Sequence, residues 1–365
     1  MIDVDKVSAA AETDAARWDR DGVPDEILTL AGRSGLLGAD RPAEFGGGAL
    51  DAHELGRLAA TLGEYCTNLR SLVTVHTMVA AAVDRWGTAD QRADWLPRLT
   101  GGDLIAALAA TEAGAGTELS AVATTFEPDG TDRLVSGNKL WVTFGQAADV
   151  FLVLGRAAGG LCAALVERDR AGVSVEPVRD QLGLRGARVA HVRFDRVRIP
   201  AAQLIAPPGF GLSHVVGTAL DHGRFTVAWG CVGLARACLA DAAGHAAGRV
   251  QGGAALADHQ LIRATLGRCW VEVAGAQALC ERAAVARVAG SPESIVATIA
   301  AKYAAARAAA AVSEQAVQVL GAAGCAPDSR AGRFYRDAKV MQIIEGAQEV
   351  AEVAIGERVL RGGAW

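Results

Sequence analysis

Apolar and polar positions divide this chain into three segments with different periodicity. From residue 1 to about 103, apolar residues recur at helical spacing over 26–36, 52–62 and 72–86. From 104 to about 208, short β-branched or alternating stretches are separated by turn-forming residues, at 134–136, 139–143, 150–154, 161–166 and 189–199. After residue 209, four long alanine-rich helical patterns follow, at 211–247, 257–288, 292–320 and 334–360.

These changes of period predict a mainly α-helical fold with a β domain in the middle. We expect an N-terminal helical domain (1–103), a middle β domain (104–208) and a C-terminal domain (209–365). The connections between the last four helices are short, which is typical of an antiparallel four-helix bundle. Within the first domain, Thr88 follows a glycine and is expected to cap the next helix.

Composition adds limits on the class of protein. The 365 residues are 51% hydrophobic and 21% charged, as in a soluble globular protein of two or three domains. The net charge of −5 gives no reason to expect nucleic acid as a partner. There is no uninterrupted apolar run long enough for a bilayer, and the first residues do not resemble a signal peptide. We therefore expect a cytoplasmic protein with no membrane partner.

The cysteines and histidines do not suggest a metal site. The seven cysteines include no Cys-x-x-Cys pair, and no histidine stands at metal-ligand spacing from them. We expect structural thiols, and we expect His76, inside an apolar helical stretch, to be a core residue.

Two motifs in the middle segment could serve a cofactor. Residues 111–118 read TEAGAGTE, a glycine loop after a strand whose N–H groups and hydroxyls could hold a pyrophosphate. Alone, this pattern is equally explained by a plain strand-to-loop turn, and it lacks the Gly-x-Gly-x-x-Gly spacing of dinucleotide-binding folds. Residues 136–143 follow as SGNKLWVT.

With these motifs the chain resembles the acyl-CoA dehydrogenase family. The resemblance continues in LGLR at 182–185, FDRVRIP at 194–200 and RDAKVMQIIEG at 336–346, in the family's order and spacing over nearly the whole chain. It implies an N-terminal helical domain, a middle β-barrel-like domain and a C-terminal four-helix bundle. It also implies FAD between the β domain and the bundle.

Contacts to the flavin half of FAD follow from the resemblance, position by position. Thr111 would hydrogen-bond the flavin pyrimidine, and Gly116 and Thr117 belong to the loop at the pyrophosphate. Trp141 would cover one flavin face, where the alternative is a core aromatic, and Thr143 would hydrogen-bond flavin N5.

The adenine half of FAD would reach a neighbouring subunit, which implies a homodimer or homotetramer. The matching positions are Arg249, Gln260, Gln318 and Gly321. The chain departs from the family at three nearby positions, with Gly252 for a Phe, Ala322 for a Gly and Ala347 for a Thr. FAD is still the expected cofactor.

Glu345 is the expected catalytic base. Oxidation of an acyl thioester between C2 and C3 needs a base for the C2 proton while a hydride leaves C3, and a carboxylate beside an apolar substrate gains basicity. A solvated helix carboxylate is the alternative. Some family members place the base two residues after the Asp of a Leu-Asp-x-x-Arg stretch, but that position is Gly223 here. Asp221, Arg224 and Gly346 are expected to contact the substrate, although Asp221 and Arg224 could instead pair on the helix surface.

Within this family, the chain resembles one subgroup more closely than the others. These are the acyl-ACP dehydrogenases that help to make hydroxymalonyl and methoxymalonyl extender units for polyketide synthases. The features are the helix at 73–78 leading to RWGT at 85–88, the short N-terminus and the GAGTE form of the flavin loop. This implies a small oxygen-bearing acyl group on an acyl carrier protein, and an electron acceptor for the reduced flavin. The candidates for docking the carrier are Arg185, Arg188 and Arg224.

Two other readings stay open from sequence. One is a short-chain acyl-CoA dehydrogenase that forms a C2–C3 double bond. The other is a flavin-binding homologue without dehydrogenase activity, against which the presence of Glu345, Trp141 and Thr143 argues.

Overall fold

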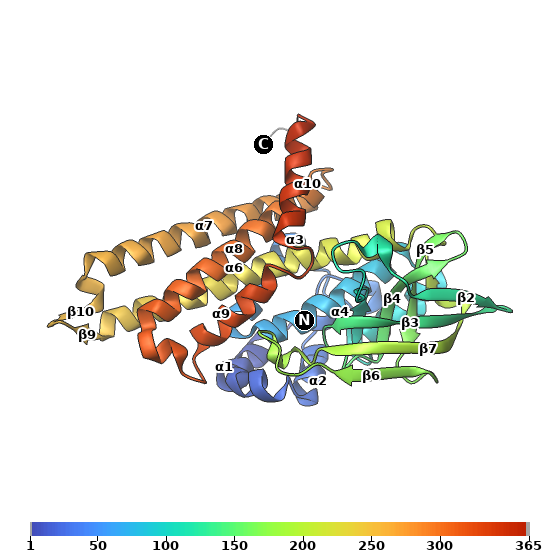
Figure 1. The fold of residues 1–365 in the computed structure, drawn as a ribbon, viewed down its shortest axis with the longest axis horizontal. Coiled ribbons are helices and arrows are strands. Elements are labelled where there is room, and N and C mark those ends of the chain that lie inside the picture. The colour runs from blue at the N-terminus through green and yellow to red at the C-terminus, as the bar shows by residue number, and fades with distance from the viewer. Residues whose placement is uncertain (1, 363–365) are drawn as a thin grey trace.

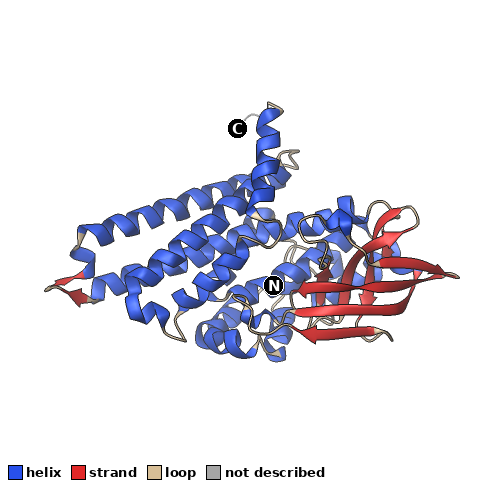
Figure 2. Ribbon diagram, in the orientation of Figure 1, coloured by secondary structure: helices blue, strands red, loops and turns tan. Residues whose placement is uncertain are grey.

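A computed structural model describes residues 2–362, which form a helical bundle at one end and a β-sheet at the other (Figures 1 and 2). The N-terminal helices pack against both. They are α1 (Val4–Asp21), α2 (Asp25–Arg33), α3 (Ala52–Tyr65), α4 (Thr67–Trp86) and α5 (Ala89–Gly101).

Local sequence sets the starts of two of these helices. The α5 helix begins with a capping box in which Thr88 accepts from the backbone of Gln91 and Gln91 bonds back to Thr88, so the predicted cap is confirmed. Asp51 and Glu54 do the same for α3. The α4 helix is buried on nearly every side from Thr67 to Val83, which makes it the central helix of this part of the fold.

The middle segment forms one mixed sheet in the order β6-β7-β3-β2-β4-β5-β8, with β1 paired to β4. The predicted stretches at 134–136 and 139–143 belong to a single strand, β3. The strands are β1 (Ala106–Ala109), β2 (Thr125–Asp129), β3 (Asp132–Val142), β4 (Val150–Ala157), β5 (Gly160–Glu167), β6 (Val173–Pro177), β7 (Ala190–Pro200) and β8 (Leu204–Ile205).

Four helices form the predicted bundle: α6 (Gly217–Gly248), α7 (Gln260–Val288), α8 (Ser294–Leu320) and α9 (Arg330–Met341). They lie side by side in Figure 1, and the short β9 (Val250–Gln251) and β10 (Ala254–Ala255) hairpin closes the end farthest from the sheet. The predicted mainly helical fold with a middle β domain is confirmed.

The prediction of one helix over 334–360 is wrong. The chain leaves the helix after Met341 and re-enters one at Gln348, and the new helix, α10 (Gln348–Leu360), points away from the bundle (Figure 1). Glu345 has φ of 56° and Gly346 has φ of 105°, and a right-handed helix does not contain such residues. The expected base therefore lies in a turn between two helices.

By length and composition alone, two bundle helices could cross a bilayer. The search of the sequence for one uninterrupted apolar run did not find them. In the Gly211–Gly248 helix, 78% of the most apolar window is buried inside the structure, and in Ser294–Cys325 44% is buried. The α6 and α8 helices pack against each other along the bundle. Most of the apolar window of the first helix therefore lies in the bundle core, and the second helix buries less than half of its window.

His76 is a core residue, as predicted. Its ring nitrogens bond the carbonyl of Leu99 and the N–H of Ala106, so it joins α4 to α5 and to β1. Burial lowers the pKa of His76 to about 4, which keeps the ring neutral. The cysteines are unpaired, and six of the seven are buried, Cys325 being exposed.

Candidate active site

The glycine loop at 111–117 is held by a buried ion pair. Glu112 accepts hydrogen bonds from Lys139 Nζ at 2.7 Å and from the backbone N–H of Ala123 and Thr124 at 2.6 and 3.0 Å. Lys139 also donates to the carbonyl of Ala110 at 3.1 Å. These bonds fix the start of the loop to strand β3 and to the segment at 123–124 that follows the loop.

The loop itself is open to solvent beyond this anchor. Gly116 and Thr117 are exposed, Thr111 is half-buried, and no atom lies within 4 Å of the position that a Cβ on Gly116 would occupy. A loop that is anchored at its start and has free backbone N–H groups at its tip suits an anionic phosphate ligand.

Trp141 presents its ring to solvent. Its side chain is 56% exposed although it belongs to the strand, and its backbone has φ of 58°. The ring makes a T-shaped contact with His191, with centroids 5.5 Å apart, and more than half of the side chain stays open to solvent. The alternative, that Trp141 is a core aromatic, is therefore wrong. Thr143, two residues further along the chain, is half-buried.

The loop at 182–187 connects this strand end to the helix that leads to Glu345. The backbone N–H of Phe144 donates to Ala187 at 2.9 Å, and the N–H of Leu184 donates to Asp337 Oδ1 on α9 at 2.7 Å. A Cβ on Gly183 would lie 2.4 Å from the carbonyl of Arg336, so only glycine allows this contact. The LGLR motif thus joins the β domain to α9.

Two cations hold the turn that carries Glu345. Arg224 Nε on α6 donates to the carbonyl of Glu345 at 2.7 Å, and Lys302 Nζ on α8 donates to the carbonyl of Gly346 at 2.8 Å. Lys302 is buried, which lowers its pKa to about 8. Arg224 therefore positions the backbone of Glu345 in this structure, and Gly346 takes the positive φ that the turn requires.

The carboxyl group of Glu345 points inward. Its Oε2 is buried and has no hydrogen-bond partner among residues 2–362. Burial raises the pKa of Glu345 to about 7, although Arg224, Lys302 and Arg70 each pull it down. A carboxyl that is about half ionised near pH 7, with a free oxygen, is suited to act as a general base.

Gly223 leaves room for this carboxyl. A Cβ there would lie 3.0 Å from Glu345 Cδ and 2.7 Å from Met78 Sδ. The alternative base position of some family members therefore lies directly beside Glu345 in space, although it is 122 residues earlier in the sequence.

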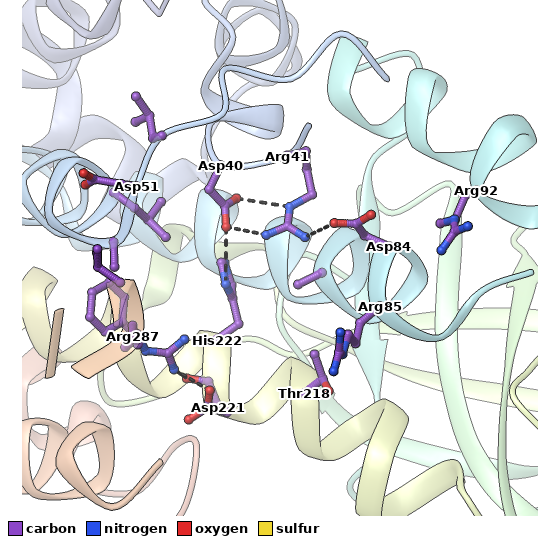
Figure 3. Close-up of a pocket in the computed structure, with 16 residues that line it drawn as sticks. Asp40, Arg41, Asp51, Asp84, Arg85, Arg92, Thr218, Asp221, His222 and Arg287 are labelled. Carbon is purple, nitrogen blue, oxygen red and sulfur yellow. Dashed lines mark hydrogen bonds and ion pairs between the residues drawn. The ribbon is translucent and has the colours of Figure 1, made fainter. Parts of the chain in front are cut away.

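Asp221 lies on a different face of α6 from Gly223. Its carboxylate pairs with Arg287 of α7, and both line a cavity of about 690 Å³ between the N-terminal helices and the bundle (Figure 3). His222 also lines it, 3.6 Å from Asp40, and Glu345 and Arg224 do not. Asp221 and Arg224 thus have different partners, Arg287 and the carbonyl of Glu345, and do not pair with each other.

The three arginines considered for carrier docking do not form one patch. Arg185 and Arg188 line a second cavity of about 850 Å³, beside α1 and α2, and Arg188 pairs with Asp25. Arg224 does not line this cavity and is bonded to Glu345. Within residues 2–362 no cluster of His, Cys, Asp and Glu could hold a metal ion.

The four residues expected at the adenine half of FAD lie at the end of the bundle away from the sheet. Arg249 follows α6 directly before β9, and Gln260 begins α7 after the hairpin (Figure 1). Gln318 and Gly321 lie where α8 ends, and all four are exposed. Trp141 and the 111–117 loop belong to the β domain at the other end, so one chain does not bring both sets together.

Comparisons with known proteins agree with this architecture over its whole length. Sequence profiles of the acyl-CoA dehydrogenase N-terminal, middle and C-terminal domains match residues 5–103, 107–197 and 210–360. Human mitochondrial short-chain specific acyl-CoA dehydrogenase is 32% identical over 354 residues, 95% of this chain and 85% of that protein. The chain belongs to the acyl-CoA dehydrogenase family.

Two solved acyl-CoA dehydrogenase folds are also similar. The first is FkbI, an enzyme for biosynthesis of the methoxymalonyl extender unit of the polyketide immunosuppressant Fk520, at 38% identity, 98% coverage of both chains and a TM-score of 0.92. The second is a glutaryl-CoA dehydrogenase from Mycobacterium smegmatis in complex with FADH2, at 25% identity and a TM-score of 0.91, covering 99% of this chain and 95% of that one.

As an acyl-CoA dehydrogenase family member, the protein is an FAD-dependent oxidoreductase that acts on acyl thioesters. Its residues fit the cofactor, because the open loop tip at Gly116 and the exposed face of Trp141 are surfaces on which a phosphate and a flat aromatic ring can lie. When bound, FAD supplies the acceptor for the hydride.

Sequence reasoning gave no role to Lys302, Lys139 or Glu112, which hold the site together in the structure. A lone lysine in an alanine-rich helix was the only available signal for Lys302. A lysine that interrupts an apolar helix face is a candidate for a buried functional contact, since burial of an unpaired ammonium is costly.

Proposed function

We propose that this dehydrogenase oxidises a small oxygen-bearing acyl group carried on an acyl carrier protein, in the formation of a polyketide extender unit. The observation that supports this most directly is the likeness to FkbI, which extends over 98% of both chains. FkbI is an enzyme for biosynthesis of a methoxymalonyl extender unit. The buried polar contacts beside the base also support it: Thr74 and Thr226 face each other at 3.0 Å between α4 and α6.

The proposed base is Glu345, and its free Oε2 accepts the proton. With an oxygen-bearing substrate, Oε2 takes the hydroxyl proton at C3 while the C–H electron pair of C3 leaves as hydride, so that C3 becomes a carbonyl carbon. With an alkyl substrate, the same oxygen takes the C2 proton and a C2–C3 double bond forms. In both cases the turn held by Arg224 and Lys302 fixes the position of the carboxyl.

The second candidate is an ordinary short-chain acyl-CoA dehydrogenase. The 32% identity to the human short-chain enzyme favours it. Coenzyme A and carrier proteins share the phosphopantetheine arm, so the residues around Glu345 serve either carrier. The two candidates differ in what recognises the carrier beyond that arm.

We also propose that the active enzyme is a homodimer or homotetramer. The β-domain half and the bundle half of the expected FAD site lie at opposite ends of one chain, so a second copy is needed to complete it (Figure 1). The bundle and the projecting helix α10 fit such a partner, because large apolar side chains are exposed on both. These include Leu261, Trp270, Val271, Val285 and Val288 on α7 and Val353 and Leu360 on α10.

The carrier is tested with one acyl group on two carriers. Purified FAD-bound protein is mixed with 3-hydroxypropionyl-ACP or 3-hydroxypropionyl-CoA, and bleaching of the flavin is followed by stopped flow. We expect faster bleaching by the carrier-protein thioester. Equal or faster bleaching by the CoA thioester would establish the second candidate instead.

A further inference from the structure

A buried aspartate joins the helix that precedes the proposed base to the loop at 182–187. Asp337 on α9 is fully buried, and its Oδ1 accepts a hydrogen bond from the N–H of Leu184 at 2.7 Å. Its Oδ2 has no hydrogen-bond partner among residues 2–362. Burial raises the pKa of Asp337 to about 6, so the carboxyl is mostly ionised above that pH. A buried carboxylate with so few partners is costly for folding alone, which makes Asp337 a candidate for a functional role.

This hydrogen bond is the last of three that run from the end of strand β3 to α9. The N–H of Phe144 donates to the carbonyl of Ala187 at 2.9 Å, and the N–H of Ala187 donates to the carbonyl of Leu184 at 3.0 Å. The N–H of Leu184 then donates to Asp337. Phe144 directly follows Thr143, so the series begins beside the residue expected at flavin N5.

Two residues in this series have an unfavourable backbone conformation. Phe144 has φ of 55° and Leu184 has φ of 53°, in the left-handed region that side chains other than glycine rarely adopt. Residues strained in this way persist only where the surrounding structure holds them, and they cluster at functional sites. The carboxylate of Asp337 gives the N–H of Leu184 a charge-assisted partner, so it is one of the contacts that hold this loop.

The other side of the same aspartate leads to the turn that carries Glu345. The N–H of Ile344 donates to the carbonyl of Val340 at 3.1 Å, and Val340 lies three residues after Asp337 on α9. Glu345 follows Ile344 directly in the chain. A shift of α9 against the loop would therefore move Glu345 relative to Thr143.

We propose that Asp337 is a positioning residue that fixes the flavin-facing end of β3 and the Glu345 turn relative to each other. Loss of a proton and loss of a hydride take place on one acyl group, so the base on one side and the flavin on the other have to be aligned, and a misplacement of about 1 Å is costly. Asp337 acts through Leu184 and through α9, without touching the substrate. This inference rests on the proposed function, to which it adds the residue that aligns the two halves of the site.

The test uses the FAD-bound enzyme and the thioester that reduces its flavin fastest. Asp337→Ala removes the acceptor, whereas Asp337→Asn keeps a carbonyl oxygen in the place of Oδ1. We expect Asp337→Ala to lower the limiting rate of flavin reduction by about 10- to 100-fold, while the Kd of the thioester changes by less than about threefold. Asp337→Asn should recover most of the rate.

Amide hydrogen exchange gives a second measurement without turnover. In Asp337→Ala, the peptides at 182–188 and 143–148 should exchange faster than in wild type, because the series of hydrogen bonds has lost its last acceptor. Gly183→Ala keeps the test open if Asp337→Ala does not fold. Its Cβ would lie 2.4 Å from the carbonyl of Arg336, so it should move the loop away from α9 and give the same loss of rate and protection.

Asp19→Asn is the matched control. Asp19 pairs with Arg336 on the same helix but joins it to α1 instead of to the loop. This variant should unfold at a lower temperature, with the limiting rate and the exchange of the peptide at 143–148 near those of wild type.

The proposal is overturned if Asp337→Ala keeps the wild-type limiting rate. It is also overturned if Asp337→Ala and Asp19→Asn lose the same share of the rate while the peptide at 143–148 exchanges as in wild type, because Asp337 would then serve only the stability of α9. Preference of the wild type for CoA over carrier protein would contradict the proposed carrier and not this role, because every comparison uses one thioester.

Discussion

Lys302 Nζ donates to the carbonyl oxygen of Gly346 at 2.8 Å, and Arg224 Nε donates to the carbonyl oxygen of the preceding residue, Glu345, at 2.7 Å. Two cations from different bundle helices therefore hold two successive carbonyls of one turn. A left-handed conformation costs a residue other than glycine roughly 1–2 kcal/mol, and charge-assisted hydrogen bonds offset a cost of this size. The strain at Glu345 is thus maintained by residues far away in the sequence.

Lys302→Met should slow flavin reduction on the order of 10- to 100-fold, because a hydrogen bond to a charged group is worth about 1.5–3 kcal/mol. It should also move the pH–rate midpoint upward, since the ammonium holds the pKa of Glu345 down. Lys302→Gln keeps a donor without the charge, so it should recover part of the rate and keep the shifted midpoint. A purely structural lysine would leave the midpoint in place.

Glu345→Gln removes the proposed base and keeps the shape of the side chain. FAD should stay bound while substrate-driven bleaching falls by about 10²–10⁴. In wild type, the bleaching rate should rise about tenfold per pH unit below about 7 and level off above, because burial raises the pKa of Glu345 to about 7 and only the ionised form accepts a proton. A wild-type rate in Glu345→Gln would place the base elsewhere.

Gly223→Ala should reduce the bleaching rate on the order of tenfold or more. The new Cβ would lie 3.0 Å from Glu345 Cδ and 2.7 Å from Met78 Sδ, so the carboxyl has to move, and a small misplacement of a reacting group is costly. Gly244→Ala on the same helix is the matched control, because no atom lies within 4 Å of its Cβ position. Equal rates in the two variants would show that Glu345 tolerates the displacement.

Trp270→Glu should weaken both assembly and FAD binding. The ring is 64% exposed on α7, and a charge in a packed subunit contact is unfavourable. Light scattering should show a smaller species, and FAD should be released more readily, because the bundle residues of a neighbour complete its site. Trp270→Phe should stay assembled. A monomer that retains stoichiometric FAD would contradict the shared site.

The helical and strand periods of the sequence were sufficient to predict the three-part order of the fold. Most predicted elements are present within a few residues, including the helix that Thr88 caps, because caps and amphipathic faces are local properties. The helix predicted over 334–360 fails for a non-local reason. Its apolar pattern continues through 342–347, but Arg224 and Lys302 supply donors that favour a turn there.

The motifs named Glu345 as the expected base and named the residues expected at the flavin, whereas the surroundings of these residues required the coordinates. From its residue type alone, Trp141 would be predicted to lie in the core, and only the fold shows that its side chain is exposed. The family match of Asp221 and Arg224 suggested one shared role, but on α6 they point to different surroundings.

What the sequence by itself determined is the family, the helical and β segments, and Glu345 as the residue to test. Tertiary structure decided the left-handed turn, the raised pKa of Glu345 and the contact with Gly223. The reason is that desolvation and pairing depend on which groups meet in space. Residues 223, 302 and 345 are separated by at least 43 positions, and no local pattern records that they meet around one turn.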